Sequence, residues 1–281
     1  MNNRSSENRF FKSPSLLSVS CLVLFVAIFF CPALFWGASV YSVDLRYVQT
    51  PIRWFLFKGE NGAVFPLWTE AIACGYPIHA YGEGGLLYPL NWLIYPFLPV
   101  PIAHDVTLMV HIMILGVGIL CWRRRIHENI VAPLVSAVVF MFSGWRCVHL
   151  THLNTTQVCA WIPWAFLALD ANRHILRPAS AVWLGLCIAL MLLAGGPQIT
   201  FYALVALTIY ALWSGMSRPR SARLPTILGM GTIIGLLLAA PQVLPTLEFA
   251  SLSSRSCGMT YEAQLVGTVS WGQLLWFIAP L

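Results

Sequence analysis

Long apolar runs separated by short polar connections make up most of the chain from residue 16 onward. A helix needs about 20 mostly apolar residues to cross a bilayer, and seven runs come near that length. They are Leu16–Trp36, Ile102–Trp122, Ile130–Cys147, Gln157–Asp170, Ala179–Ala194, Ile199–Trp213 and Thr226–Leu244. The pattern therefore predicts an all-α integral membrane protein with about seven transmembrane helices. The fourth to sixth runs are short, which favours helices that pack inside the bundle or continue past these limits.

The composition supports the same class. Hydrophobic residues make up 58% of the 281 positions and charged residues 9%, whereas a soluble domain carries about 25% charged residues. The net charge of +6 comes from basic residues spread between apolar runs, which is typical of membrane anchoring rather than of nucleic-acid binding. The eight cysteines stand singly, without a CxxC motif or zinc-ligand spacing, and are expected to pack as small apolar residues.

The basic residues also predict how the helices are oriented. With a cytoplasmic N-terminus, eleven of the sixteen Lys and Arg residues fall in cytoplasmic segments, as the positive-inside rule requires. The run Leu86–Leu98 is short and broken by prolines, so we expect a re-entrant or interfacial segment there. The first run ends in the bulky Phe35 and Trp36 instead of a small-residue cleavage site, which favours a retained helix over a secretory signal.

These predictions divide the chain into three parts. Residues 1–15 are a cytoplasmic tail, residues 16–247 are the membrane bundle, and residues 248–281 are an extracytoplasmic segment. The bundle includes a large first extracytoplasmic loop, residues 37–101, which is the longest connection and is rich in aromatic residues. Aromatic rings suit the interface between bilayer and water, where one side of the ring is wet.

Two parts of this loop are predicted to be short helices along the membrane surface. They are Leu45–Lys58 and Leu67–Cys74. A connection of this length usually has a function of its own, and the alternative is a structural cap over the bundle.

The acidic residues point to the outer side of the membrane as the place of any chemistry. Seven of the ten carboxylates fall on that side in the predicted orientation. Asp44 is singled out because it lies just past the first helix, at the predicted mouth of the bundle. A carboxylate at a partly desolvated interface can act as a general base or hold a divalent cation near a phosphate. An ordinary solvated acid is the alternative.

Other polar positions are weaker candidates. His149 and His152 share one face if the helix continues, and two imidazoles can bind a phosphate or share a metal, although no third ligand is evident. Gln198 either belongs to a tight turn or lines a polar cavity. Glu248 is expected to face the bundle interior or water, because a carboxylate that faces lipid is costly. No Walker loop, GxSxG, HExxH or dinucleotide motif is present, which argues against nucleotide-driven transport and the familiar hydrolases.

Seven short segments occur in a characteristic order. They are DLRYVQTP (44–51), FPLW (65–68), GYP (75–77), GGLLYPLN (84–91), FSG (142–144), GGPQ (195–198) and QVLPTLE (242–248). Together they resemble the bacterial YfhO family of multi-spanning membrane proteins, which is similar to the GT-C class of glycosyltransferases. The resemblance extends over about residues 40–281. Because members of this family are typically longer, the chain is expected to be a fragment, a truncated product or half of a split protein.

The resemblance implies a multi-pass protein of the bacterial cytoplasmic membrane with a GT-C-like fold. It implies a transferase that takes a sugar from a polyprenyl-phosphate donor and passes it to an unidentified cell-envelope acceptor on the extracytoplasmic face. The catalytic acid of the first outer loop in GT-C enzymes corresponds to Asp44. Many such loops carry a second acid nearby, but here that position is Arg46. A divalent metal therefore lacks the support of a second acid, and the cofactor is unassigned.

The substrate-binding candidates come from the segments that carry the resemblance and from the two-histidine motif. They are Arg46, Gln49, Arg53, Glu83, Tyr88, Asn91, His149, His152, Gln198 and Glu248. Arg46 and Arg53 are candidates for the phosphate by charge and reach, and Glu83 stands where the family is expected to carry an amide.

Two further functions are left open by the sequence. A transporter or flippase of lipid-linked intermediates needs charged groups along a path through both leaflets, and the cytoplasmic halves of the predicted helices carry few. A non-catalytic membrane assembly protein would use the large aromatic loop to cap a partner.

Overall fold

The computed structural model describes residues 14–40, 42–59, 66–72, 74–125, 129–172, 177–216 and 222–253, together with residues 256, 258 and 272. In these ranges the chain forms helices and turns, and the one pairing of extended backbone is an isolated bridge between Thr69 and Tyr76. Most of the predicted tail 1–15 and of the predicted segment 248–281 lies outside the described residues.

Every predicted apolar run coincides with one helix or with a pair of consecutive helices. The elements are α1 (Leu16–Phe29), α2 (Cys31–Trp36), the π-helical turn η1 (Leu45–Gln49), α3 (Thr50–Lys58), α4 (Pro89–Ile94), α5 (Val100–Arg123), α6 (Val131–Met141), α7 (Gly144–Val148), the 3-10 turn η2 (His149–Thr151), α8 (Leu153–Asp170), α9 (Pro178–Leu193), α10 (Pro197–Met216) and α11 (Arg223–Ser251). The all-helical class predicted from the sequence is confirmed for the described residues.

Four segments of the described chain are long and apolar enough to cross a membrane. They are Val100–Arg123, Val131–Thr151, Pro197–Ser214 and Arg223–Ser251. The helices α1 and α9 are apolar but shorter, and α8 begins with the polar sequence Asn154 to Gln157. These four helices suggest a membrane protein, whereas the total of seven spans and their orientation stay predictions.

Proline and glycine explain why two of the predicted runs are divided. The helix α1 ends at Phe29, and Pro32 lies in the first turn of α2. A proline ring clashes with the carbonyl of the preceding turn and so disfavours a continuous helix here. The third run changes direction at Phe142 and Ser143 before Gly144 begins α7. This second break brings the short helix α7 back toward the bundle.

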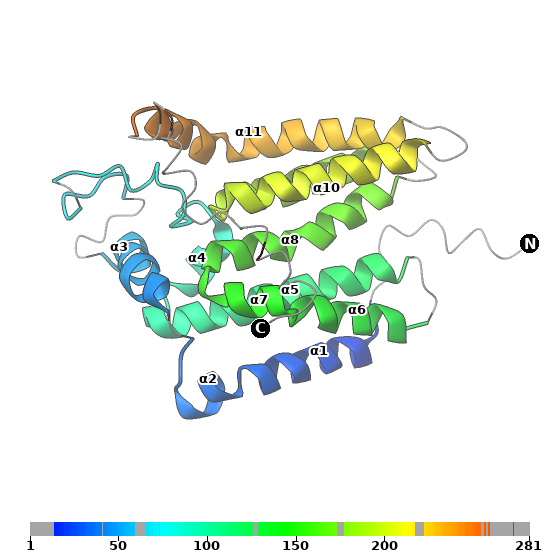
Figure 1. Ribbon diagram of the computed structural model, residues 1–281, viewed down its shortest axis with the longest axis horizontal. Coiled ribbons are helices and arrows are strands. Elements are labelled where there is room, and N and C mark those ends of the chain that lie inside the picture. Colours follow the sequence, from blue (N-terminus) through cyan, green and yellow to red (C-terminus); the bar gives the residue numbers. More distant parts are fainter. Residues whose placement is uncertain are drawn as a thin grey trace, which may run out of the picture.

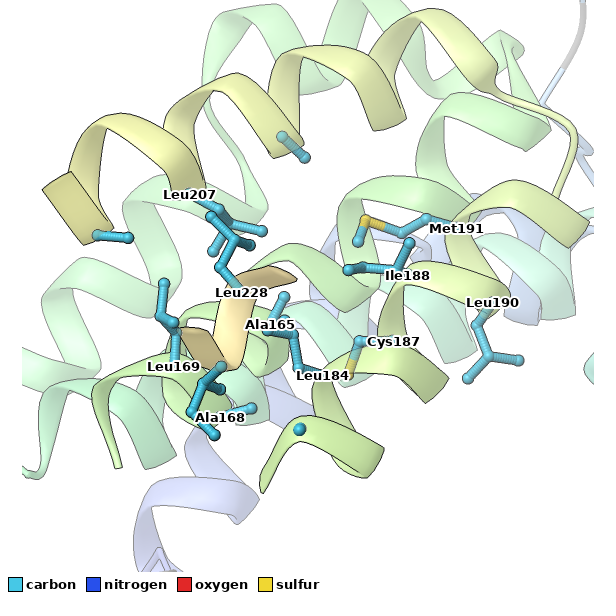
Figure 2. Packing of buried hydrophobic residues seen from close by; sticks show 14 of the residues in the cluster. Ala165, Ala168, Leu169, Leu184, Cys187, Ile188, Leu190, Met191, Leu207 and Leu228 are labelled. Atoms are coloured by element: carbon cyan, nitrogen blue, oxygen red, sulfur yellow. The ribbon is translucent and has the colours of Figure 1, made fainter. Parts of the chain in front are cut away.

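The long helices lie side by side, and the segment between α2 and α5 covers one end of them (Figure 1). We call this end, which carries the described residues between α2 and α5 (37–40, 42–59, 66–72 and 74–99), the loop end. The helices α8, α9, α10 and α11 pack around a cluster of buried aliphatic side chains that includes Leu184, Ile188 and Leu228 (Figure 2). A second cluster joins α1, α5 and α6 through residues such as Leu22, Ile112 and Met141.

The contact between α9 and α11 depends on glycine. A Cβ atom at Gly231 would lie 2.7 Å from Cγ of Leu184, and one at Gly185 would lie 2.6 Å from Cγ2 of Ile234. Neither distance is possible between real atoms, so the two backbones approach more closely than alanine would permit. Small residues at helix contacts are typical of packing inside membranes.

The first loop agrees in part with its prediction. Leu45–Lys58 is helical, as η1 followed by α3. The predicted helix over Leu67–Cys74 is wrong, because the Thr69 and Tyr76 backbones exchange hydrogen bonds of 2.9 and 2.8 Å in a tight turn. Cys74, with φ of 62°, and Gly75, with φ of 141°, hold conformations that a helix excludes. Leu86–Leu98 contains the six-residue helix α4 and turns, which is too short to form a span.

Candidate functional site

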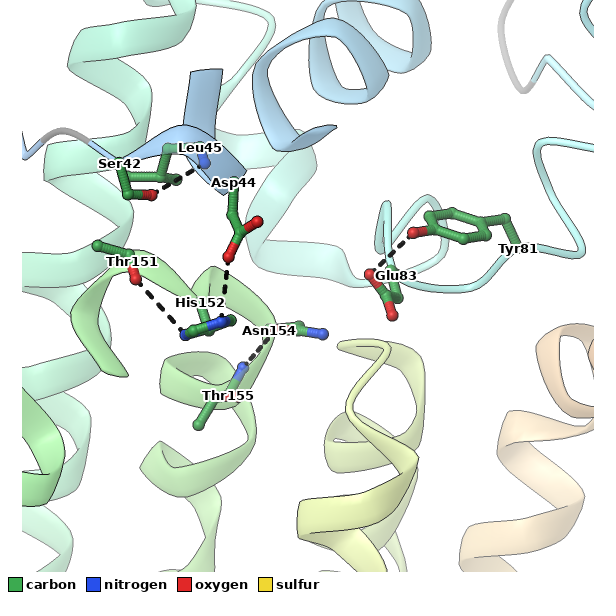
Figure 3. A network of polar contacts seen from close by, with 9 residues as sticks. All are labelled: Ser42, Asp44, Leu45, Tyr81, Glu83, Thr151, His152, Asn154 and Thr155. Atoms are coloured by element: carbon green, nitrogen blue, oxygen red, sulfur yellow. Dashed lines mark hydrogen bonds and ion pairs between the residues drawn. The ribbon is translucent and has the colours of Figure 1, made fainter. Parts of the chain in front are cut away.

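Asp44 and His152 form an ion pair at the loop end. The Oδ2 atom of Asp44 lies 3.4 Å from Nε2 of His152, and the two side chains are 59% and 47% exposed. Asp44 directly precedes η1, and His152 lies between η2 and α8. Figure 3 shows the two side chains pointing toward one another from these separate elements. The basic partner of the predicted catalytic acid, His152, therefore lies 108 positions after Asp44 in the chain.

Local hydrogen bonds explain why the Asp44 carboxylate faces outward. The backbone N–H of Leu45 donates to Oγ of Ser42 at 3.1 Å, and the Thr50 hydroxyl donates to the Leu45 carbonyl at 2.6 Å. These two bonds satisfy the backbone N–H and carbonyl of Leu45, the first residue of the π-helical turn. Asp44 makes no capping bond of its own, so its carboxylate is available to His152.

The second histidine of the motif has a different environment. Nδ1 of His149 lies 2.8 Å from the Trp145 carbonyl, and its ring stacks on the Trp145 ring with centroids 4.3 Å apart. The helix does not continue to His152, although the two imidazole centroids are 5.6 Å apart. Among the described residues, no group of three or more His, Cys, Asp or Glu side chains is placed to hold a metal ion.

Glu83 and Asn154 complete the polar groups at this end. Nδ2 of Asn154 donates to the Gly195 carbonyl at 3.1 Å, and the Tyr81 hydroxyl donates to Oε2 of Glu83 at 3.0 Å. Burial raises the pKa of the Tyr81 phenol, and the neighbouring Glu83 carboxylate raises it further. In Figure 3 the Asn154 side chain lies between the Asp44–His152 pair and Glu83. We call Asp44, Glu83, His152 and Asn154 the loop-end cluster.

A glycine contact fixes the position of Glu83 relative to α9. Gly195 has φ of +80°, and a Cβ atom there would lie 2.7 Å from Cα of Glu83 and 2.9 Å from the carbonyl carbon of Gly82. The turn after α9 therefore presents bare backbone to the loop. A larger residue would separate Glu83 from α8 and α9.

Behind the cluster, a buried chain of polar groups joins the loop to α8. Nη2 of Arg53 lies 3.4 Å from Oε1 of Gln157, and Nε2 of Gln157 donates to Oδ1 of Asn91 at 2.7 Å. Nδ2 of Asn91 in turn donates to the Gly85 carbonyl at 2.9 Å. Arg53, Asn91 and Gln157 have no exposed surface. Two of the predicted substrate-binding residues, Arg53 and Asn91, therefore hold the loop in place.

Arg53 is a buried cation whose nearest groups are aromatic and amide side chains. Its guanidinium lies over the Tyr95 ring, 4.9 Å from the centroid, and its Nε and Nη1 atoms make no hydrogen bond. Burial lowers the pKa of Arg53. The Oε1 atom of the buried Gln49, one helical turn earlier, also has no hydrogen-bond partner.

Tyr88 is buried in a second polar chain. Nδ1 of His111 lies 2.6 Å from the Thr107 carbonyl, which assigns the imidazole proton to Nδ1 and leaves Nε2 as an acceptor. The Tyr88 hydroxyl, 2.7 Å from Nε2, therefore donates to it and accepts from Nε1 of Trp161 at 2.8 Å. These bonds connect the loop with α5 and α8.

The remaining predicted residues lie apart from the loop-end cluster. Arg46 is exposed and lies over the Tyr47 ring, 5.5 Å from its centroid. Gln198 is exposed in the first turn of α10 and donates to the Tyr202 hydroxyl at 2.9 Å. Glu248 is exposed near the end of α11.

Sequence reasoning missed two residues of consequence. Gln157 connects the loop to α8, and it was read as the polar start of an apolar run. Arg146 is 4% exposed, and no described carboxylate or carbonyl oxygen accepts a hydrogen bond from its guanidinium. The signal for Arg146 was present in the sequence, because an arginine inside an apolar run such as Ile130–Cys147 is costly in a membrane and usually functional.

Comparisons of the chain with protein-family models, with curated proteins and with solved structures found no match. The family resemblance therefore rests on the seven quoted segments alone.

Proposed function

We propose that the chain acts as a glycosyltransferase of the bacterial cytoplasmic membrane. In this proposal it transfers a sugar from a polyprenyl-phosphate donor to a cell-envelope acceptor on the extracytoplasmic face, at the loop end. The Asp44–His152 pair carries the proposal, because it is an exposed carboxylate held by an imidazole next to helices that are apolar enough for a bilayer.

The pair supplies a general base for the acceptor hydroxyl. With the His152 imidazole next to Oδ2 of Asp44, the Oδ1 atom is left to take the hydroxyl proton. The acceptor oxygen then forms a bond to the anomeric carbon, and the bond from that carbon to the phosphate oxygen breaks. The lipid phosphate leaves with the electron pair. In these roles Asp44 is the catalytic base and His152 is a positioning residue.

Glu83 and Asn154 are suited to hold the sugar. Carboxylate and amide oxygens accept hydrogen bonds from sugar hydroxyls. Asn154 follows His152 by two positions and donates to the Gly195 carbonyl, and the Glu83 backbone packs against Gly195. Their different elements, the loop and α8, would keep the sugar between the two halves of the cluster.

The experiment measures sugar transfer from a polyprenyl-phosphate sugar in proteoliposomes that contain the full chain. Asp44→Asn is expected to lower the rate by at least about 100-fold, the usual contribution of a general base. Glu70→Gln changes another exposed carboxylate of the same loop and is expected to leave the rate unchanged. Full transfer by Asp44→Asn would exclude Asp44 as the base.

The role of His152 is tested by comparing two substitutions in the same assay. His152→Gln keeps an N–H that can donate to Asp44 and is expected to retain most of the rate, whereas His152→Ala loses it. Equal rates for the two variants would contradict a positioning role.

A further inference from the structure

A second feature lies along the bundle rather than at the loop end. It is a cleft of about 770 Å³ lined by α5, α6, α8, α10 and the segment Ser143–Arg146. No residue of the loop-end cluster lines it. The volume is within the range of small-molecule sites, about 300–1,000 Å³.

The packing of the helices explains the shape of the cleft. The helix α5 packs against α8, while α6 packs on α5 and α10 packs on α8. Figure 1 shows α10, α8, α5 and α6 in this order. The helices α5 and α8 therefore form a floor, with Ile119 and Ile162 among its residues, and Phe140 and Ala206 stand on the two walls.

The walls are mostly apolar, and two arginines line the cleft. Arg146 lies at the loop-end side, and Arg123 lies at the opposite side, where α5 ends. Arg146 lines the cleft and is 4% exposed. The Cys159 thiol, a weak hydrogen-bonding group, is its polar neighbour. Among the described residues, no carboxylate or carbonyl oxygen accepts a hydrogen bond from Nε, Nη1 or Nη2 of Arg146. A buried guanidinium whose neighbours are thiols is costly unless another group supplies the negative charge.

A chain of rings links this arginine to the proposed base. Trp145, the neighbour of Arg146, also lines the cleft and stacks on His149. The His149 ring lies next to the His152 ring, which pairs with Asp44. A headgroup bound at Arg146 would therefore be close to the loop-end cluster, while an attached apolar chain would extend along the cleft toward Trp122.

We infer that this cleft binds the lipid part of the donor, with the apolar chain along α5 and α8 and the anionic phosphate on Arg146. A guanidinium matches a phosphate through paired N–H···O bonds, and a donor phosphodiester carries one negative charge, which balances the charge of Arg146. The identification of this lipid as the donor rests on the proposed function, whereas the cleft and its charge do not. Arg146 would also stabilise the phosphate as it leaves.

The experiment measures binding of a polyprenyl phosphate to the purified full chain in detergent, without acceptor. Arg146→Gln is expected to weaken binding by roughly tenfold to a hundredfold, which is the range for the loss of a charge-assisted hydrogen bond. Arg223→Gln, at an exposed arginine outside the cleft, is the matched control and is expected to bind normally. Thermal unfolding of each variant shows whether it is folded.

A second variant tests the apolar part without a change of charge. Ala206→Trp fills the cleft and is expected to weaken binding at least tenfold. Val205→Trp, at the adjacent exposed position outside the cleft, is expected to have no effect. Normal binding by both Arg146→Gln and Ala206→Trp would overturn the inference.

Two further ligands separate the sources of the phosphate. Inorganic phosphate is expected not to compete with polyprenyl phosphate for binding, and phosphatidylglycerol is expected to compete weakly. If phosphatidylglycerol competes as well as polyprenyl phosphate itself, the cleft is a site for bilayer lipid and the assignment to the donor is overturned. Asp44→Asn is expected to bind polyprenyl phosphate normally. Loss of transfer in Asp44→Asn together with normal binding in both Arg146→Gln and Ala206→Trp would thus reject the cleft and retain the proposed function.

Discussion

The Tyr88 hydroxyl shows how single polar atoms hold the first loop against the bundle. It lies between His111 of α5 and Trp161 of α8, and it is completely buried. Burial raises the pKa of Tyr88, so the hydroxyl keeps its proton and remains a donor to His111. A residue that the sequence marked for substrate binding thus has all of its hydrogen bonds inside the protein.

Removal of this hydroxyl is expected to destabilise the fold. Tyr88→Phe leaves Nε2 of His111 and Nε1 of Trp161 buried without partners, which costs about 1–3 kcal/mol. The thermal unfolding midpoint in detergent measures the effect, and Tyr47→Phe, at a side chain that is 66% exposed, is the control. An unchanged midpoint combined with weaker lipid binding would place Tyr88 in a substrate site instead.

Contacts between residues that lie far apart in the sequence could not be predicted from the sequence. Asp44 was predicted from its place after the first apolar run, which is a local property. Its partner His152 and the contact of Asn91 with Gln157, 66 positions apart, depend on how the loop folds back onto α8. Neither apolar periodicity nor motif spacing contains that information.

At the scale of elements, α9 and α11 pack through bare backbone. The carbonyl oxygen of Gly231 would lie 3.0 Å from a Cβ atom at Gly185, and the Leu184 side chain fills the space opposite Gly231. Dispersion contacts and close backbone approach drive such packing, because lipid provides no hydrophobic force between helices. The long apolar runs predicted these helices, but the glycine positions alone did not show which helices meet.

Two alanine substitutions on α11 test this contact. Gly231→Ala is expected to lower the unfolding midpoint by several degrees, because overpacking of a tight contact costs about 1–3 kcal/mol. Gly229→Ala introduces the same methyl group where nothing lies within 4 Å, so its midpoint is expected to stay the same or rise with the better helix propensity. A similar decrease for both variants would argue against a close helix contact.

The turn at Cys74 and Gly75 shows why one short element was predicted wrongly. The composition of Leu67–Cys74 suits an interfacial helix, but the bonds between Thr69 and Tyr76 and the positive φ of Cys74 close a turn instead. A Cβ atom at Gly75 would lie only 2.6 Å from the Trp68 ring, which leaves no room for a side chain there. A contact between neighbouring parts of the loop overrides its amphipathic pattern.

At the scale of the whole molecule, charge is divided between the two ends of the bundle. Arg125 pairs with Asp170 at 3.7 Å at the end opposite the loop, and the Tyr210 hydroxyl donates to the same carboxylate. The loop-end cluster lies at the other end. The positive-inside rule predicts that the end with Arg125 faces the cytoplasm.

Cysteine labelling of intact cells tests this orientation. Cys74 is exposed at the loop end and is expected to react with a membrane-impermeant maleimide. In a variant that otherwise lacks cysteine, Asn129→Cys, at an exposed position between α5 and α6, is expected to react only after permeabilisation. The reverse pattern would invert the topology and contradict an extracytoplasmic transferase.

The close packing of Gly82 and Glu83 against Gly195 has a consequence for the synthesis of the protein. The turn after α9 leaves the ribosome more than a hundred residues after the loop that rests on it. At common synthesis rates this is a delay on the order of ten seconds. During that interval the aromatic loop has left the ribosome without its final support. The loop-end cluster therefore assembles late in biogenesis, after α9 and its turn have left the ribosome.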